Sequence, residues 1–260
     1  MEVVLKKFVG ILFLFTIVFK QVFAGQIIVY AASDLVYSFG EIKKIYEKQN
    51  PQDKIRLIFG SSGKGYHQIL KGAPYDIFFS ANIKYVELLK EKGLTKSKII
   101  LYAKGKIGIW SRKDSGIDLS KGIYVVLNPE VKKIAIANWE HAPYGQAAKE
   151  CFEYFNLFKK VKKKLVIGEN ISQTAQFVEI GAADVGFIAY SLAKSDKLQN
   201  EGNFYLLPQK CYKTIKQGAV ILKHATLNKE RYNTALRFFR FIKSKDCKKI
   251  MKKYGFSTDE

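Results

Sequence analysis

The sequence predicts an α/β fold built around a parallel sheet, and two observations support this prediction. Short apolar stretches rich in β-branched residues alternate with longer stretches whose apolar residues recur every three or four positions, which is typical of strands followed by helices. Repetition of this strand, loop and helix unit indicates a parallel α/β sheet. Apolar residues make up 48% of the 260 residues, which is enough to form substantial cores.

The expected elements follow one another along the chain. Strands are expected first at 27–30, 54–60 and 75–81, and helices at 35–50, 64–72 and 82–94. Further strands are expected at 104–112, 133–138, 163–170, 184–191 and 203–208, and helices at 146–156, 171–183 and 232–244. Neither a repeat nor a low-complexity linker divides the chain, so two lobes would require the chain to cross between them.

Residues 1–24 are predicted to be a secretory signal peptide. Two lysines precede the apolar run Phe8–Phe19, and the motif VFA, which ends at Ala24, has the small residues of a cleavage site. The run is shorter than the roughly 20 apolar residues of a membrane anchor, and no cysteine for a lipid anchor lies near Ala24. We therefore expect cleavage after Ala24, export to the periplasm and a mature chain of 236 of the 260 residues.

The chain is strongly basic, with a formal net charge of +21, or +19 once the three lysines and one glutamate of the leader are removed. Such a charge suits nucleic acid, anionic lipid or a small anion. The lysines are dispersed in pieces such as FKKVKKK and KSKDCKK, which favours a solvated basic surface over a nucleic-acid site. The positive field would still attract an anionic ligand.

Four predicted strands end in the same way, with small or polar residues that lead directly into a helix. The four places are Ala32–Asp34, Gly60–Gly63, Ala142–Gly145 and Glu169–Ser172. Ligands of parallel α/β sheets bind at such strand ends, and the free N–H groups and dipole of a helix start favour an anion there. The motif GSSG adds close backbone approach and O–H donors, so it predicts hydrogen bonds to an oxyanion. Taken singly, each place is also an ordinary helix N-cap.

Enzymatic and nucleotide-binding functions have little support in the sequence. The three histidines match no metal-binding spacing, and the segment around Lys64 lacks residues that a nucleotide-binding phosphate loop requires. A Ser-His-Asp group could be assembled only in space, from Ser62, His67 or His141, and Asp34, because no local nucleophile motif is present. We therefore predict neither an enzyme nor a bound cofactor.

Longer motifs resemble the periplasmic molybdate-binding proteins of molybdate ABC importers. The motifs are VYAASDL, FGSSGKGYHQILKGAPYDIFFSAN, IAIANWEHAPYGQAAKE and GENISQTAQFVEIGAADVGFIAYS, and their order makes the resemblance specific over the whole mature chain. The resemblance implies a type II periplasmic-binding-protein fold, in which two α/β lobes joined by hinge strands close over one tetrahedral oxyanion. It places lobe 1 at residues 25–104 plus 208–260 and lobe 2 at residues 105–207.

Matched position by position, the resemblance also implies the ligand contacts. Donors alone would hold the anion, from Ser33, Asp34, Ser62 with Ser61 beside it, the Tyr144 phenol and the backbone N–H of Ile171. Some relatives have Ser or Asn at the position of Asp34, and an ionised carboxylate facing the pocket would repel a dianion. The Asp34 side chain is therefore expected to cap the following helix while its N–H donates to the ligand. Some relatives have Tyr at the position of Ala189, which is left out of the site.

The three cysteines, Cys151, Cys211 and Cys247, match no metal-binding motif. An exported chain can form one disulfide from them in three ways. Cys211–Cys247 is the expected pair because the implied architecture puts both in lobe 1, and three buried free thiols are the alternative.

The implied function is an extracytoplasmic solute-binding protein that captures molybdate, and tungstate as well because the two anions are nearly isosteric. No cation ligands are expected, and the expected partner is the membrane permease of the importer. The chain is expected to be a monomer that binds no nucleic acid. One alternative is the same scaffold binding sulfate or phosphate. The other is a metal-binding protein that holds ferric iron with Tyr144, Tyr190 and Asp34.

Overall fold

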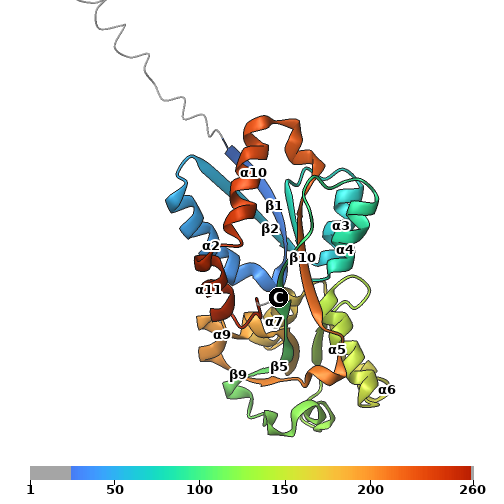
Figure 1. Cartoon of the computed structure of the whole chain (residues 1–260). Helices are drawn as coiled ribbons and strands as arrows, with labels where there is room; N and C mark the ends of the chain where they lie inside the picture. The colour runs from blue at the N-terminus through green and yellow to red at the C-terminus, as the bar shows by residue number, and fades with distance from the viewer. Residues whose placement is uncertain (1–24, 259–260) are drawn as a thin grey trace, which may run out of the picture.

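The structure is a computed structural model that describes residues 25–258, which form two α/β lobes stacked end to end (Figure 1). The expected signal peptide and its cleavage site lie outside the described residues. Each lobe is built on one five-stranded sheet. This arrangement agrees with the two-lobed α/β fold expected from the sequence. Within residues 25–258, no helix has both the length and the apolar character to cross a membrane.

Lobe 1 contains both ends of the described chain. Its strands are β1 (Gly25–Ala32), β2 (Asp53–Gly60), β3 (Ile77–Ser80), β4 (Ile100–Gly105) and β10 (Ile215–Ile221), in the order β2-β1-β3-β10-β4. Its longer helices are α2 (Val36–Gln49), α3 (Ser62–Leu70), α4 (Ile83–Glu91), α10 (Lys229–Phe241) and α11 (Lys245–Lys253). Figure 1 shows α2, α10 and α11 on one side of the sheet and α3 and α4 on the other, so both faces are covered.

Lobe 2 is formed by the middle of the chain. Its strands are β5 (Ile107–Arg112), β6 (Ile134–Ala137), β7 (Leu165–Gly168), β8 (Val185–Ala189) and β9 (Gly202–Leu206), in the order β7-β6-β8-β5-β9. Its helices are α5 (Pro143–Tyr154), α6 (Phe158–Val161), α7 (Ile171–Glu179), α8 (Tyr190–Ala193) and α9 (Asp196–Glu201). Strands β6, β7 and β8 are connected by helices and run parallel, since β6 pairs in parallel with both β7 and β8.

The sheets are mixed rather than parallel, which corrects the sequence prediction. The stretch 104–112, expected as one strand, is divided at Lys106 into β4 of lobe 1 and β5 of lobe 2, so the chain crosses between lobes there. The sequence did not predict β10, which returns the chain to lobe 1 and pairs antiparallel with β3 and β4. The lobe bounds at 104–105 and 207–208 stay a prediction.

Aromatic side chains and one buried carboxylate hold the helices of lobe 1 to its sheet. Tyr46 of α2 packs edge-on against Phe238 of α10, with ring centroids 5.0 Å apart. The Tyr46 hydroxyl donates to Asp53 at 2.6 Å, and Arg237 Nη2 pairs with the same carboxylate at 2.6 Å. A buried carboxylate is stable only when donors surround it, so this group fixes α2 and α10 against the start of β2.

The disulfide joins Cys151 to Cys211, so the expected Cys211–Cys247 pair is wrong. Cys151 lies on α5, Cys211 ends the short 3-10 helix Gln209–Cys211, and their Cα atoms are 4.5 Å apart. Both belong to the core of lobe 2, whereas Cys247 is unpaired and buried in the core of lobe 1. The sequence does not reveal that the segment before β10 packs against α5 before the chain returns to lobe 1.

Removal of this disulfide should destabilise the protein. The bridged cysteines are 60 positions apart, and closing a loop of that size contributes about 2–4 kcal/mol by restricting the unfolded chain. We expect the Cys151→Ala/Cys211→Ala double variant to lose about that free energy of unfolding in urea titrations. Dithiothreitol should lower the unfolding midpoint of the wild type and leave that of the double variant unchanged. A wild-type midpoint that does not respond to the reductant would contradict this prediction.

Candidate functional site

A small cavity lies where the two lobes meet, at the ends of β1, β2 and β3 and at the loops after β6 and β7. Its lining residues are Ala32, Ser33, Asp34, Gly60, Ser61, Ser62, Ala81, Ala142, Pro143, Tyr144 and Ile171. The structure therefore brings together all six residues that the sequence predicted: Ser33, Asp34, Ser61, Ser62, Tyr144 and Ile171. The cavity is small, about 10 Å³, which is close to the least space that holds one water molecule.

Three α-helices begin at this cavity. Ser62, Pro143 and Ile171 are the first residues of α3, α5 and α7, and all three line it. The first N–H groups of a helix have no partner within the helix, and the helix dipole places partial positive charge at that end. Among residues 25–258, no lysine, arginine or histidine lines the cavity, so its attraction for an anion comes from helix starts rather than from cations.

Two serine hydroxyls add donors to the cavity. Ser62 Oγ accepts the N–H of Ala81 at 2.9 Å, and Ser33 Oγ accepts the N–H of Ser172 at 3.4 Å. Because each oxygen is already an acceptor, each hydroxyl hydrogen is available to an acceptor in the cavity. Both side chains are buried.

Helix α7 presents its first N–H group to the cavity. Asn170, the N-cap residue, accepts hydrogen bonds from the N–H groups of Ser172 at 3.0 Å and Gln173 at 3.1 Å. The cap therefore satisfies the second and third N–H groups of the helix and leaves the N–H of Ile171 uncommitted. This geometry is compatible with the predicted role of Ile171 as a backbone donor.

The Asp34 side chain does not cap a helix, so that part of the sequence prediction is wrong. Its Oδ2 accepts hydrogen bonds from Tyr144 Oη at 2.8 Å and Gln217 Nε2 at 2.7 Å, and Gln217 Nε2 also lies 3.0 Å from Tyr144 Oη. Tyr144 belongs to α5 of lobe 2 and Gln217 to β10, so one carboxylate joins lobe 2 to the returning strand. Gly105 makes room for the group, because a Cβ there would collide with Tyr144 Oη.

Burial raises the pKa values of both Asp34 and Tyr144. Asp34 is 1% exposed, and desolvation raises the pKa of its carboxyl to about 6, although the hydrogen bonds from Gln217 and Tyr144 act to lower it. Desolvation also raises the pKa of the Tyr144 phenol well above its ordinary value, and the charge of Asp34 acts in the same direction. The phenol therefore keeps its proton, and Asp34 is the member of the group that titrates near neutral pH.

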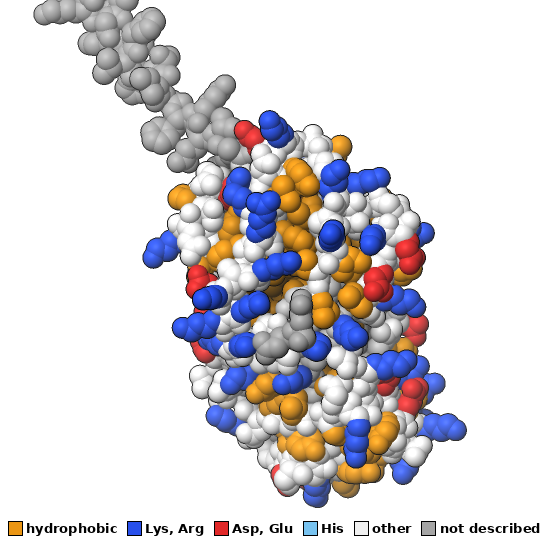
Figure 2. Space-filling model, in the orientation of Figure 1, with side chains coloured by type: hydrophobic (Ala, Val, Ile, Leu, Met, Phe, Trp, Pro, Cys, Tyr) orange, Lys and Arg blue, Asp and Glu red, His pale blue; other side chains and the backbone are white. Residues whose placement is uncertain are grey.

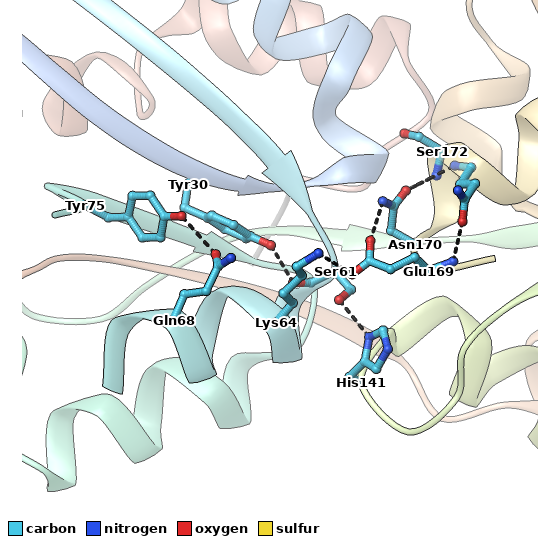
Figure 3. Close-up of polar contacts among 10 residues, drawn as sticks. Tyr30, Ser61, Lys64, Gln68, Tyr75, His141, Glu169, Asn170 and Ser172 are labelled. Carbon is cyan, nitrogen blue, oxygen red and sulfur yellow. Dashed lines mark hydrogen bonds and ion pairs between the residues drawn. The ribbon is translucent and has the colours of Figure 1, made fainter. Parts of the chain in front are cut away.

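Polar contacts join the two lobes beside the cavity, and Figure 3 draws the Ser61–His141 and Lys64–Glu169 contacts. Ser61 Oγ lies 2.8 Å from His141 Nδ1, and the N–H of Gly63 donates to the His141 carbonyl at 2.9 Å. Lys64 Nζ reaches Glu169 Oε1 at 3.3 Å. These contacts join the start of α3 in lobe 1 to two loops of lobe 2. The Lys64 and Glu169 side chains are 52% and 36% exposed, so this pair forms the outer rim of the cleft.

The structure does not assemble the alternative sites considered from the sequence. His141 contacts Ser61 rather than Ser62, so the serine, histidine and aspartate of a nucleophilic enzyme do not form a hydrogen-bonded chain. Tyr190, which a ferric-iron site would need, stacks on Phe204 with centroids 5.2 Å apart and does not line the cavity. Within residues 25–258, no group of three or more His, Cys, Asp or Glu is placed to hold a metal ion.

On the face of the molecule shown in Figure 2, basic side chains are dispersed rather than gathered in one patch. On the face shown, lysines and arginines lie over both lobes and alternate with apolar and acidic groups. This distribution agrees with the interpretation of the positive charge as a solvated surface.

Comparison with known proteins identifies the family. The sequence matches the family described as "Bacterial extracellular solute-binding protein" over residues 27–257. It is 33% identical to the molybdate-binding protein ModA of Rhodobacter capsulatus, over 91% of this chain and 90% of that protein. The chain belongs to the ModA family. This ModA-family chain is also 32% identical to ModA of Azotobacter vinelandii, over 90% of each chain.

A solved structure supports the same assignment. The Azotobacter vinelandii periplasmic molybdate-binding protein superimposes with a TM-score of 0.82 at 30% identity, over 90% of this chain and 100% of that chain. The resemblance expected from the sequence motifs and the type II periplasmic-binding-protein fold are therefore confirmed.

Sequence reasoning missed two polar residues of this ModA-family site. Gln217 lies on β10, which was not predicted. His141 was considered only for a Ser-His-Asp group, and its contact with Ser61 was not predicted. One signal was present in the segment IKQGAVI, where a single glutamine interrupts an apolar strand. A buried amide needs hydrogen-bond partners, so such a glutamine indicates a buried polar group nearby.

The free energy of unfolding should depend on pH through Asp34. The pKa of this carboxyl rises from 3.8 to about 6 on folding, so the folded state binds the proton more tightly than the unfolded chain. Ionisation of Asp34 therefore lowers the free energy of unfolding. The loss begins above pH 4 and reaches about 3 kcal/mol above pH 6. Relative to wild type, Asp34→Asn should gain about that much between pH 4 and pH 7.

Urea unfolding at the two pH values measures this gain. Asp114→Asn is the control, because the Asp114 side chain is 76% exposed and lies outside the cavity. A difference between Asp34→Asn and wild type that stays constant with pH would show that Asp34 does not titrate in this range.

Proposed function

We propose that this protein captures molybdate outside the cytoplasm and delivers it to the membrane permease of an ABC importer, with tungstate as a second ligand. The observation that supports this most strongly is the cavity between the lobes. Three helix starts and two serine hydroxyls offer hydrogen-bond donors there, and no cationic side chain of residues 25–258 lines it. Such a site suits an oxyanion. The relatives named as molybdate-binding proteins, at 33% and 32% identity, support the choice of molybdate.

Capture requires no bond to form or break, so no residue is assigned a catalytic role. With the lobes apart, each would offer some of the donors: Ser33 and Ser62 from lobe 1, and the N–H of Ile171 from lobe 2. Closure would replace the hydration shell of the anion with these donors. Exclusion of water lowers the local dielectric, which strengthens each hydrogen bond to the charged ligand.

Hydrogen phosphate is the second candidate ligand, and one specific observation favours it. Asp34 lines the cavity, and its Oδ1 is buried without a hydrogen-bond partner in the described structure. An ionised Asp34 could accept the O–H of hydrogen phosphate, whereas sulfate carries no such hydrogen at neutral pH. The identity of the relatives nevertheless favours molybdate.

Location and partners follow from the same proposal. Cleavage after Ala24 would release the chain into the periplasm, where the lobes at residues 25–104 plus 208–260 and 105–207 would act as a monomer. Closure of these lobes would produce the form that docks on the permease.

Ligand-induced stabilisation should identify the anion. A ligand at 100 times its dissociation constant stabilises the folded state by roughly 2.7 kcal/mol. We therefore expect molybdate and tungstate to raise the melting temperature in a thermal-shift measurement, and sulfate and phosphate at the same concentration to raise it less. If sulfate or phosphate stabilises the protein and molybdate does not, the chosen anion is wrong. If none of the four does, oxyanion capture is rejected.

Loss of one serine donor should weaken binding. Ser62→Ala removes a hydroxyl that faces the cavity, and an unmet buried acceptor costs about 1–3 kcal/mol. We expect titration calorimetry to show molybdate affinity reduced by that amount in Ser62→Ala and in Ser33→Ala. Ser120→Ala is the matched control, because the exposed Ser120 hydroxyl donates to Asp118 in lobe 2 and Ser120 does not line the cavity. Wild-type affinity in both site variants would remove these hydroxyls from the binding site.

A further inference from the structure

The Asp34 carboxylate stands out because its two oxygens have different surroundings. Oδ2 accepts hydrogen bonds from Tyr144 and Gln217 at 2.8 and 2.7 Å. Oδ1 is buried and has no hydrogen-bond partner among the described residues. Asp34 lines the cavity. Its Oδ1 is therefore an unsatisfied acceptor beside a cavity whose other polar groups are donors.

No neighbouring cation offsets the charge of this carboxylate. The side chains that face it are Tyr144 from α5, Tyr102 from β4 and the neutral amide of Gln217 from β10. Ser191 from α8 donates to the Asp34 carbonyl at 2.8 Å. Within residues 25–258, no ion pair joins Asp34 to a lysine, arginine or histidine. Ionised Asp34 can only accept hydrogen bonds. It would repel an oxyanion by its negative charge, and no hydrogen atom would be available for a hydrogen bond between the two.

We propose that Asp34 takes up one proton from solvent when the oxyanion binds and thereby becomes a hydrogen-bond donor to it. This proposal rests on the proposed function, because it concerns the same cavity. The step is a simple protonation: the carboxylate gains a proton on binding and loses it on release. Asp34 is then a proton-dependent ligand residue rather than a fixed source of repulsion.

Either position of the added proton supplies one donor to the cavity. On Oδ1, the proton would point from the unpaired oxygen towards the ligand, while Oδ2 would keep accepting from Tyr144 and Gln217. On Oδ2, the proton would be donated to Tyr144 Oη, which frees the tyrosine hydrogen for the ligand. Tyr144 lines the cavity as well, so both routes place the extra hydrogen against the anion.

The pKa of the Asp34 carboxyl also suits the uptake of a proton on binding. Burial raises the pKa of Asp34 to about 6, and a dianion in contact with it would raise this pKa further. Well below pH 6, Asp34 is already neutral, and binding takes up no proton. Above that pH, binding takes up one proton, and affinity falls by up to about tenfold for each pH unit.

His141 is a second ionisable side chain near the cavity. Its Nδ1 lies 2.8 Å from Ser61 Oγ at the rim of the cavity, as Figure 3 shows, so a charged imidazole could also attract an anion. Lys64 and Glu169 face the same rim but form an ion pair with each other. The experiment must therefore separate Asp34 from His141.

Titration calorimetry with sodium molybdate from pH 5.5 to 8.5 tests the proposal on the mature protein. Two buffers with different ionisation enthalpies, PIPES and imidazole, give the number of protons taken up at pH 7.5. We expect about one proton per molybdate in the wild type and a dissociation constant that rises up to about tenfold per pH unit above pH 6.

Three variants assign the proton. In Asp34→Asn, which cannot titrate, we expect no proton uptake from the site residue and a dissociation constant nearly independent of pH. His141→Gln should keep the wild-type pH dependence, because its proton is not the one exchanged. Asp114→Asn, an exposed carboxylate outside the cavity, should match the wild type in both affinity and proton count.

The outcomes separate this proposal from the proposed function. No molybdate binding at any pH would reject the function itself. Molybdate binding without proton uptake in the wild type, a result that needs no variant, would overturn the role of Asp34 alone. Loss of the pH dependence in His141→Gln, with its retention in Asp34→Asn, would assign the proton to His141 and overturn the proposal in the same way.

Discussion

The absence of a cationic side chain from the cavity lining within residues 25–258 is the constraint that organises the rest of the structure. A charge can be buried there only if N–H and O–H groups replace the water around it. Helix starts supply such N–H groups, and those of α3, α5 and α7 belong to different lobes. The chain must therefore cross between two sheets and bring their strand ends face to face, which is what the β4–β5 and β9–β10 connections achieve.

The local part of this arrangement can be predicted from the sequence, because each donor lies beside its own strand end. Ser33, Ser62 and Ile171 follow β1, β2 and β7 within a few residues, and short-range patterns are enough to find them. The second crossing could not be predicted in that way. Gln217 meets Asp34 across 183 positions, and Cys211 meets Cys151 across 60. Both contacts depend on where β10 and the segment before it pack, which hydrophobic periodicity does not reveal.

Asp34 shows how a sound local rule can fail. Aspartate at a helix start ordinarily accepts from the backbone N–H groups that follow, and such capping was the expected role. The tertiary structure offers stronger partners, a phenol and an amide from two other elements, and it removes the carboxylate from water. In this setting the side chain stops being a local cap and becomes a buried acid, whose charge depends on what enters the cavity.

In the proposed capture cycle, the balance between open and closed lobes would depend on the strength of the contacts across the cleft. The Lys64–Glu169 pair at the rim is substantially exposed, and such pairs contribute about 0–1 kcal/mol. The buried contact through Asp34 is opposed by the cost of its own charge. Hydrogen bonds such as that from the Gly63 N–H to the His141 carbonyl, at 2.9 Å, also join the lobes. An anion that accepts hydrogen bonds from both lobes adds interactions that exist only in the closed form, so closure and occupancy become thermodynamically coupled. A permease that recognises the closed form would thereby recognise the loaded one.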